Sequence, residues 1–370
     1  MTNAHDIVVI GAGIAGASLA AELASTARVL LLEREARPGM HSTGRSAAMF
    51  HLTYGGPRVQ PLSALALERF GMLDPQFWPH PVLAPRGMVM IADEAGEAAL
   101  ADQVAHSSGA LVPVTSAEAQ ARFPLLRPEA FCAAAIDESG QDIDVDALHQ
   151  GYLRQFAARG GTLMCKAAIT RIARSGSGWL LETTNGPLTT PLIVNAAGAW
   201  GDQLAQLAGV TPVGLQPKLR TAALIEAPEG SNHWPMLIDA LETFYVKPDA
   251  GRFILSPADE TDVEAHDAAA DDMTLAEGAE RMAHYIDWEV RKKPVAWAGL
   301  RTFSPDRVPV IGFDPDETGF FWLVGQGGFG VQSAAGVVAL AAHLIAPGTF
   351  RQPAELDPQH YDPARFRRSA

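Results

Sequence analysis

The chain has 370 residues, of which 48% are hydrophobic and 19% are charged, as is typical of a globular protein. Asp and Glu outnumber Lys and Arg by 42 to 28, and the formal charge of −14 argues against nucleic acid and anionic membrane surfaces as partners. The length predicts two domains or one large interleaved unit.

The cysteine and histidine positions predict neither a disulfide nor a metal site. Cys132 and Cys165 stand alone, which indicates free thiols in a reducing compartment, and we expect a cytoplasmic protein. The eleven histidines include no close pair such as H-x-x-x-H, so no metal is expected. Residues 1–6 are polar and the first strand follows at once, so no signal peptide is expected. The late apolar stretch at 334–346 is too short to span a bilayer, so no transmembrane segment is expected.

The first 34 residues carry the most informative pattern. Residues 7–10 form a short apolar run typical of a buried parallel strand, and residues 17–25 continue as an Ala- and Leu-rich helix. Between them stands a G-x-G-x-x-G turn. Gly11 allows the tight turn, Gly13 lets backbone approach a pyrophosphate, and Gly16 lets helix and strand pack closely. The helix N-terminus would face phosphates.

A second apolar strand at 29–32 ends in an acid. Glu33 lies where a carboxylate can hydrogen-bond both hydroxyls of an adenosine ribose, and it would repel a 2′-phosphate, so NADP is not expected. The alternative is a glycine-rich turn with no ligand. Strand, turn, helix, second strand and terminal acid are all present in order, and this favours a dinucleotide site.

Residues 38–48 form a polar stretch of small side chains directly after the ribose acid. Small residues permit close backbone contact with a flat ligand, and the hydroxyls of Ser42, Thr43 and Ser46 can bond phosphate or ring heteroatoms. The alternative is a plain surface loop.

The segment E-R-x-x-x-P-G-x-x-S-T-G-R-S-A-A, residues 33–48, resembles the FAD-contacting segment of the D-amino-acid oxidase-like flavoproteins, and most of all that of the D-arginine dehydrogenase type. The resemblance extends over residues 7 to about 346. It implies that Glu33 and Arg34 serve the adenosine end and that residues 42–48 run along the pyrophosphate and flavin. The cofactor is expected to be non-covalent FAD, bound by Gly11, Gly13, Ala15, Gly16, Glu33, Arg34, Ser42, Thr43, Gly44, Arg45, Ser46, Ala47, Ala48, Ile169, Ala197, Gly198, Gly327, Gly328, Phe329, Gly330, Val331 and Gln332.

The middle of the chain alternates between the two predicted domains. Helices are expected at 62–72, 93–107 and 116–122, with a strand at 88–91. Asp144 is a plausible N-cap for a helix at 145–159, and strands follow at 163–172, 179–183 and 192–194, with a turn at Asn185-Gly186. In the family, the passage after the last of these strands returns the chain to the cofactor.

The last third carries a second informative group. Strands are expected at 218–225 and 243–247, a solvated acidic loop at 259–272, and a helix at 275–290 whose basic end, residues 291–293, suits a C-terminus. Residues 301–312 match the family segment R-x-x-x-P-D-x-x-P-x-x-G. A strand at 320–324, a glycine-rich turn at 325–330 and a helix at 331–345 follow. A second dinucleotide site is rejected there, because no further strand or ribose acid follows; the helix more plausibly points at the flavin.

Arg301 is the expected carboxylate ligand of the substrate, because its planar fork can bind a carboxylate through two parallel N–H bonds. The alternative is a structural arginine paired with an internal acid. The resemblance implies that Tyr245 shares carboxylate binding and that Tyr54, on a mobile loop, covers the substrate. A core aromatic is the alternative for Tyr245. Arg220 is a weaker match, with surface charge as its alternative, and Gly328 would offer its backbone to the substrate amine.

Two departures from the D-arginine dehydrogenase type bear on the substrate. Gly87-Met88 stands where that type carries a glutamate for the substrate side chain, and Met49 stands where it has a histidine beside the flavin. A cationic side chain would lack a partner, so we expect uncharged, mainly apolar side chains to be preferred. Glu94 or Glu97 could act as a substitute anion.

The expected fold is α/β, with a discontinuous Rossmann-like FAD-binding domain over 1–50, 141–211 and 301–370. A mixed α+β substrate-binding domain is expected over 51–140 and 212–300. The expected function is FAD-dependent oxidative deamination of a D-amino acid, with O₂ or a quinone as electron acceptor. The alternatives are an oxidase of glycine, sarcosine or another secondary amine, a non-catalytic FAD-bearing protein, and a nicotinamide dehydrogenase.

Overall fold

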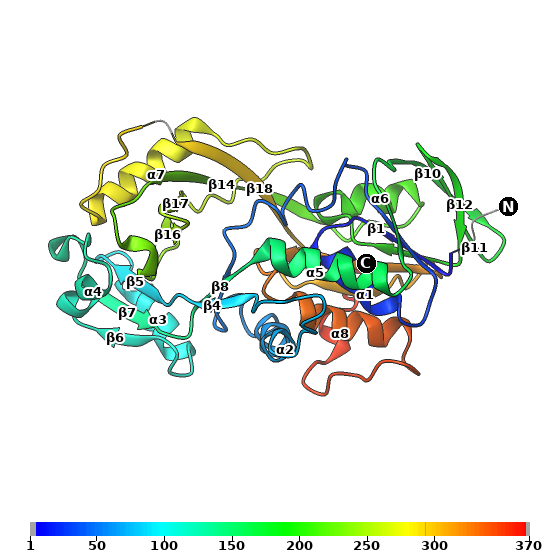
Figure 1. Cartoon of the computed structure of the whole chain (residues 1–370), viewed down its shortest axis with the longest axis horizontal. Coiled ribbons are helices and arrows are strands. Elements are labelled where there is room, and N and C mark those ends of the chain that lie inside the picture. The colour runs from blue at the N-terminus through cyan, green and yellow to red at the C-terminus, as the bar shows by residue number, and fades with distance from the viewer. Residues whose placement is uncertain (1–4, 293, 368–370) are drawn as a thin grey trace.

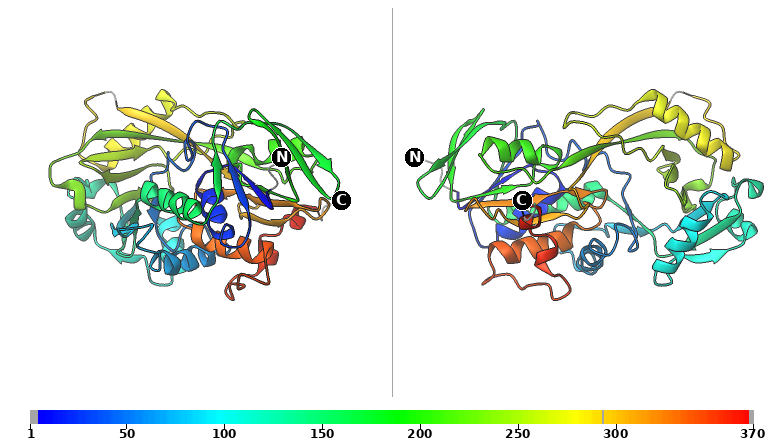
Figure 2. Two further views of the ribbon diagram at one scale, coloured as in Figure 1. Left: turned by 45° about the vertical axis from the view of Figure 1, so that its right-hand side comes forward. Right: turned by 180° about the vertical axis from the view of Figure 1, so that it is seen from behind.

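The computed structural model describes residues 5–292 and 294–367. It has two lobes, joined by the long antiparallel strands β14 (Gln216–Glu226) and β18 (Val295–Phe303), which reach from one lobe toward the other (Figure 1). Both ends of the described chain lie in the lobe that contains β1 (Ile7–Ile10), as the reverse view also shows (Figure 2). The family fold expected from the sequence, a parallel sheet with helices and a second domain, is confirmed.

The first lobe is built on a six-stranded sheet with the order β19-β20-β13-β1-β2-β9. All neighbours are parallel except β19 and β20, which form an antiparallel edge. The other five strands are β2 (Val29–Leu32), β9 (Thr162–Met164), β13 (Leu192–Asn195), β19 (Val310–Phe313) and β20 (Phe320–Val324).

The two faces of this sheet bury alternate residues. Ile7 and Val9 face a layer of helices, namely α1 (Ile14–Leu23), α2 (Gln60–Phe70), α5 (Val145–Ala158) and α8 (Ala334–Ile345). Val8 and Ile10 face the opposite layer, which consists of α6 (Gly201–Leu207) and the antiparallel sheet β10 (Ile169–Ser175), β11 (Gly178–Thr183) and β12 (Gly186–Thr190). Burial on both faces explains why these strands are continuous apolar runs.

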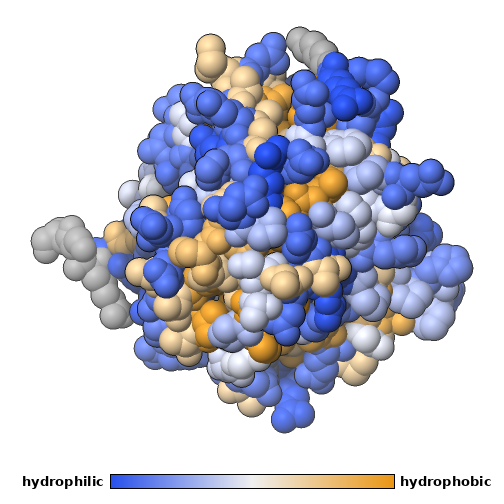
Figure 3. Space-filling view, turned by 90° about the vertical axis from the view of Figure 1, so that its left-hand side faces the viewer, coloured by the Kyte–Doolittle hydropathy of each residue, from blue (hydrophilic) through white to orange (hydrophobic). Residues whose placement is uncertain are grey.

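The second lobe is built on a nine-stranded mixed sheet with the order β21-β18-β14-β17-β16-β15-β5-β7-β6. Helices α4 (Ser116–Arg122) and α7 (Asp272–Tyr285) pack on one face of this sheet, and α3 (Glu97–His106) packs near its far end. The remaining strands are β5 (Met88–Ala92), β6 (Val112–Val114), β7 (Ala133–Asp137), β15 (Met236–Asp239), β16 (Tyr245–Asp249), β17 (Arg252–Ser256) and β21 (Gln326–Gly327). Hydrophilic side chains cover most of this end of the molecule, with smaller hydrophobic areas between them (Figure 3).

A small sheet of β3 (Met49–Phe50), β8 (Gln141–Ile143) and β4 (Leu83–Pro85) lies between the lobes. Helix α2 falls in the part of the chain expected to belong to the substrate domain, yet it packs on α8, and its Leu62, Ala66 and Phe70 belong to the core of the first lobe. We retain the division into domains as a proposal.

Four expected elements differ in the structure. The helix expected at 93–107 begins only at Glu97, because the Asp93 carboxylate accepts the N–H groups of Ala95 and Gly96 in a turn before it. The strand expected at 163–172 is divided into β9 and β10, because Lys166 turns with φ +54° and its N–H bonds to Glu35 O. Helix α7 ends at Tyr285 rather than at residue 290, because Ile286 leaves the helix in an extended conformation to pair with Leu126. The basic residues 291–292 therefore do not cap it, and residue 293 lies outside the described residues. Helix α8 begins at Ala334, three residues later than expected, after a turn at 328–333.

No helix among residues 5–292 and 294–367 is long and apolar enough to cross a membrane. Both cysteines carry free thiols, and Cys132 is exposed while Cys165 is half-buried.

Candidate active site

A cavity of about 500 Å³ lies where the carboxyl ends of β1, β2 and β13 meet one face of the nine-stranded sheet. Ligands in open α/β sheets bind at this end of the strands. One end of the cavity is lined by the glycine-rich turn and Glu33, and the other by side chains of β14, β15, β16 and β18.

The first end has the features of a dinucleotide cradle. Gly11 has φ +104°, and a Cβ there would lie 2.4 Å from Ala196 O. A Cβ on Gly16 would lie 1.9 Å from Gly11 O, so these two positions accept only glycine, as the motif predicts. Gly13 is the N-cap of α1, whose first N–H groups have no partner within the helix. The Thr43 hydroxyl accepts the Ile14 N–H at 3.0 Å, so the remaining N–H groups of the first turn are the donors available to a ligand.

Glu33 is buried at the end of β2, and its side chain lines the cavity. Its carboxylate accepts hydrogen bonds of 3.0 Å from the backbone N–H of Ala12 and from that of Glu35. Two fixed donors orient the carboxylate, and its remaining lone pairs can accept bonds from a ribose.

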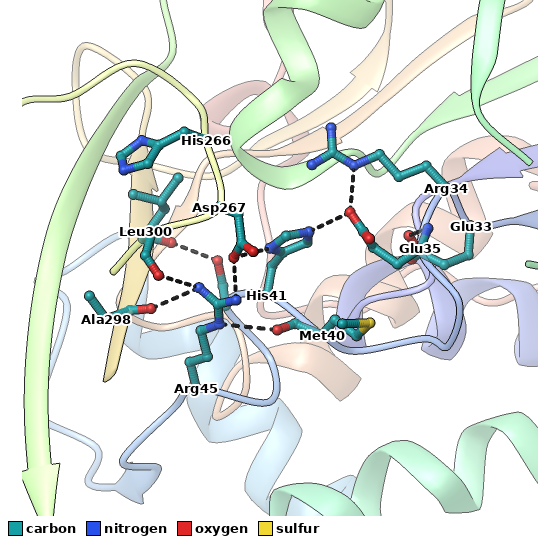
Figure 4. Close-up of polar contacts among 12 residues, drawn as sticks. Glu33, Arg34, Glu35, Met40, His41, Arg45, His266, Asp267, Ala298 and Leu300 are labelled. Atoms are coloured by element: carbon teal, nitrogen blue, oxygen red, sulfur yellow. Dashed lines mark hydrogen bonds and ion pairs between the residues drawn. The ribbon is translucent and has the colours of Figure 1, made fainter. Parts of the chain in front are cut away.

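The end of the cavity near Glu33 also contains a group of aromatic and basic side chains that the sequence did not predict as a cluster. The guanidinium of Arg34 lies 3.7 Å over the ring of Trp200, and its Nε donates to Glu35 at 3.0 Å. His41 bonds the same Glu35 carboxylate through Nε2 at 2.9 Å (Figure 4). Its ring also packs against Trp200, with ring centroids 4.7 Å apart. The bond from His41, and less so that from Arg34, lowers the pKa of Glu35.

Arg45 joins this region to the acidic segment at 259–272. Its Nη1 donates to Ala298 O at 3.0 Å and to Ala268 O at 2.8 Å, its Nε donates to Met40 O, and its Nη2 forms a short ion pair with Asp267 (Figure 4). That pair lowers the pKa of Asp267.

The acidic segment is a loop with mostly exposed acidic residues, as expected, but several of its carboxylates are also paired with neighbouring side chains. Asp259 accepts bonds from the backbone N–H and the hydroxyl of Thr221, and Asp262 bonds Lys218 at 2.5 Å. Glu260 accepts from Arg307 at 3.0 Å and from Arg220 at 3.3 Å. The segment lies along β14, and its cationic partners are some 40 residues away in sequence, which explains why charge density alone did not predict the pairing.

The second end of the cavity is formed by one face of the nine-stranded sheet. Because side chains alternate along a strand, residues two apart face the cavity together. They are Arg220 and Ala222 on β14, Met236 and Ile238 on β15, Tyr245 and Lys247 on β16, and Gly299 and Arg301 on β18.

Arg301 and Tyr54 meet inside this end. Arg301 Nη1 donates a hydrogen bond of 2.9 Å to the Tyr54 hydroxyl. Among the residues that the structure describes, no carboxylate forms an ion pair with Arg301. The alternative of an arginine paired with an internal acid is thus not what the structure contains. Burial lowers the pKa of Arg301, whereas Tyr54, Tyr245, Glu260 and Glu242 raise it, and the net effect is an increase. The guanidinium therefore stays cationic.

Arg220 lies diagonally beside Arg301, because Arg220 pairs with Gly299 in the β14–β18 register. Burial, followed by repulsion from Arg301, lowers the pKa of Arg220. Its Nε donates to Asp259 O at 2.9 Å, so this arginine is held by the acidic segment and is not a surface charge. Gly328 lies close by, and a Cβ there would come within 3.1 Å of both the Arg301 guanidinium and the Tyr54 hydroxyl.

His51 is a further ring at this end. It stacks on Tyr54 with ring centroids 5.0 Å apart, and its Nδ1 lies 3.2 Å from the Thr53 hydroxyl. Burial lowers the pKa of His51 to about 4, against an opposing effect of Asp137. The imidazole is therefore neutral at neutral pH.

Two buried polar atoms in the cavity wall lack partners. Thr302 Oγ1 and Gln326 Nε2 have no hydrogen bond among the described residues, and both residues line the cavity. Both atoms are themselves buried in the wall, so they do not supply contacts to a ligand. The glycine cradle and the oriented Glu33 carboxylate are the features that fit a dinucleotide.

The predicted residues converge on this cavity. All five predicted substrate residues line it, as do most predicted FAD contacts. Gly16, Gly44 and Phe329 do not. Gly16 serves helix packing, Gly44 faces Gly39 O in a turn, and Phe329 packs on Tyr54 and Phe303. Their roles as contacts remain predictions.

The expected side-chain determinants lie elsewhere than predicted. Met49 lines the cavity, but Gly87 and Met88 do not. Glu94 and Glu97 also lie outside the lining. The residues that sequence reasoning missed include His41, His51, Trp200, Met236, Ile238, Glu242, Lys247, Thr302 and Gln326. Only Lys247 carried a usable signal, as it alternates with Tyr245 on one strand.

A family model described as FAD dependent oxidoreductase matches residues 6–344. The chain belongs to the FAD-dependent oxidoreductase family. FAD is the cofactor of this oxidoreductase, in agreement with the cradle, and the expectation from the sequence is confirmed. A nicotinamide dehydrogenase is thereby set aside.

Similar proteins span nearly the whole oxidoreductase. FAD-dependent oxidoreductase domain-containing protein 1 of Bos taurus is 26% identical, over 94% of this chain and 82% of that protein. Glycine oxidase of Geobacillus kaustophilus is 24% identical, over 93% of this chain and 94% of that enzyme. The crystal structure of L-proline dehydrogenase from P. horikoshii has a TM-score of 0.86 at 21% identity, covering 100% and 99% of the two chains, which shows a shared fold. The narrower resemblance to the D-arginine dehydrogenase type is not supported by these relatives.

Proposed function

We propose that this oxidoreductase oxidises the amine of an α-amino acid, and that its preferred substrates are D-amino acids with uncharged, mainly apolar side chains. The observation that carries the proposal is Arg301, a buried guanidinium that lines the cavity and bonds Tyr54 but forms no ion pair with a carboxylate of the described chain. A buried cation without an anionic partner is unfavourable, and a substrate carboxylate supplies that partner.

Arg301 binds the substrate carboxylate, with Tyr54 and Tyr245 as further hydrogen-bond donors. Arg220 adds a second positive charge beside it. Gly328 leaves room for the substrate amine, because even a Cβ there would press on the Arg301 guanidinium and the Tyr54 hydroxyl at 3.0–3.1 Å. FAD supplies the acceptor for the hydride that leaves Cα, and the resulting imine hydrolyses in water to a 2-oxo acid and ammonia.

The preference for apolar side chains rests on the lining of the cavity. Met49, Ala222, Met236 and Ile238 present apolar groups to it, and the flexible methionines can adapt to different shapes. An apolar side chain gains by burial against these residues.

A second candidate is the oxidation of glycine, sarcosine or another secondary amine. It is favoured by the similarity to a glycine oxidase along almost the full length of both chains. Arg301 would bind these substrates in the same way, since they also carry a carboxylate. A non-catalytic FAD-bearing protein is the remaining alternative. The electron acceptor is O₂ or a quinone, and we propose a cytoplasmic location.

The test is a steady-state comparison of kcat/KM with an artificial electron acceptor. The panel contains D- and L-alanine, D-methionine, D-leucine, D-phenylalanine, D-arginine, glycine and sarcosine. We expect the apolar D-amino acids to exceed D-arginine by at least tenfold. A higher value for sarcosine or glycine would establish the second candidate, and a preference for D-arginine would mean that an acid controls the side-chain pocket.

A further inference from the structure

The charged groups at the substrate end of the cavity are not all paired. Arg220, Lys247, Arg301 and Glu242 line this end. Arg220 bonds Glu260 at 3.3 Å, and Lys247 bonds Asp142 at 3.0 Å, so both have carboxylate partners behind the cavity wall. Within the described residues, Glu242 has no hydrogen bond or ion pair to its carboxylate, just as Arg301 has no carboxylate partner.

Glu242, which lines the cavity, lies on a fixed turn between β15 and β16. Glu242 has φ +53°, a left-handed conformation that is unfavourable for a residue other than glycine. Buried Asp239 maintains it: its carboxylate accepts from the N–H groups of Thr243, at 2.7 Å, and Phe244, at 2.9 Å, and its carbonyl accepts from Glu242 N–H at 2.9 Å. Arg281 Nε also bonds Thr243 O. The turn therefore persists despite its strain.

The position of Glu242 matters because the other acid in the lining lies far along the cavity. Glu33 is at the cofactor end, and its carboxylate is engaged by two backbone donors. Glu242 is exposed at the rim of the substrate end, and its charge contributes to raising the pKa of Arg301. The substrate end thus presents one unpaired positive charge inside and one unpaired negative charge at its rim.

We propose that Glu242 is a specificity-determining residue that excludes amine substrates carrying a second carboxylate. This proposal rests on the function proposed above. The site accepts zwitterionic amines with a single carboxylate, which Arg301 binds. A second carboxylate placed toward the rim meets the like charge of Glu242, and repulsion weakens its binding. A cationic group in the same place is attracted.

The experiment compares the FAD-loaded enzyme with E242Q, which keeps the shape of the side chain and removes its charge. E97Q, on the exposed first turn of α3 and outside the cavity, is the matched control for the loss of one charge. We measure kcat/KM for D-glutamate and for D-lysine, each relative to D-methionine, at low and high salt. In E242Q the D-glutamate ratio should rise about fivefold and the D-lysine ratio should fall, since one partly exposed charge acts with this magnitude. High salt should reduce both changes.

A second readout does not require turnover. Succinate and propionate binding to the oxidised holoenzyme is followed through the flavin absorbance, and E242Q should tighten succinate relative to propionate. If no amine reduces the flavin, the proposed function is wrong. The ratio of succinate to propionate affinity still tests the role of Glu242 in that case. The inference is overturned if the D-glutamate and succinate ratios of E242Q stay within twofold of those of the wild type and E97Q. It is also overturned if the D-glutamate and D-lysine ratios rise together, because this would indicate that the substitution enlarges the pocket rather than removes a charge.

Discussion

Arg301 on β18 and Tyr54, 247 residues earlier in the loop after β3, meet through a hydrogen bond of 2.9 Å. Tyr54 also packs edge-on against Phe329 with ring centroids 4.9 Å apart. The bond therefore joins the second lobe, the loop after β3 and the glycine-rich turn before α8 at one point. A carboxylate ligand of Arg301 would lie where all three segments converge.

Replacement of Arg301 by Met should remove most activity while FAD stays bound. Loss of the charged partner of a buried carboxylate should cost about 3–5 kcal/mol in kcat/KM. FAD content and kcat/KM are measured on the same preparation, with R301K as the control that keeps charge but not the planar fork. An R301M enzyme within tenfold of wild type would mean that another residue holds the carboxylate.

Replacement of Glu33 by Gln should weaken FAD binding. The carboxylate accepts the backbone N–H groups of Ala12 and Glu35 on its two oxygens, and an amide can accept only one of them. The dissociation constant of FAD, followed through the quenching of its fluorescence on reconstitution of the apoprotein, should rise about tenfold. E68Q, at an exposed position of α2 outside the cavity lining, is the control, and equal affinities for E33Q and wild type would show that Glu33 does not orient the cofactor.

The FAD is predicted to be bound non-covalently. Residues 42–48, where a covalent link to the flavin could form, contain neither His nor Cys. Acid precipitation of the purified protein should release the yellow colour into the supernatant. Colour retained in the pellet would instead point to a nearby nucleophile, of which His41 and His51 are in the cavity wall.

The stability of the protein should depend on His51 between about pH 4 and pH 6.5. Burial lowers the pKa of His51 from 6.5 to about 4, so the unfolded chain binds more protons than the folded one in this range. The stability conferred by the neutral imidazole is thus fully present above pH 6.5 and is lost as the pH falls toward 4. The Tm of the wild type should fall more over this range than that of H51Q. Parallel curves for the two proteins would show that His51 does not titrate there.

Local patterns predicted the elements whose determinants lie within a few residues. The strand at 7–10 and the helix at 116–122 have the observed bounds, and the latter has a capping box between Thr115 and Glu118. The glycine spacing also predicted the cradle, because Gly11 and Gly16 are required by contacts within one βαβ unit and with the adjacent strand β13.

What the sequence could not predict depends on contacts between distant segments. Helix α7 ends where Ile286 pairs with Leu126, and the acidic segment is ordered by partners on β14. Glu242 enters the site because Asp239 fixes a strained turn, for which the sequence has no glycine or asparagine as a signal. His51 acquires its low pKa from burial, which only the assembled fold determines.

The most direct test of the account is anaerobic mixing of the holoenzyme with the best amine of the panel. The flavin absorbance is recorded, and the 2-oxo acid is trapped as a hydrazone. The account predicts that the flavin bleaches and that one 2-oxo acid and one ammonia form for each FAD reduced, with both lost in R301M. Bleaching by a 2-hydroxy acid or another alcohol but by no amine, or bleaching by an amine without a 2-oxo acid, would contradict it.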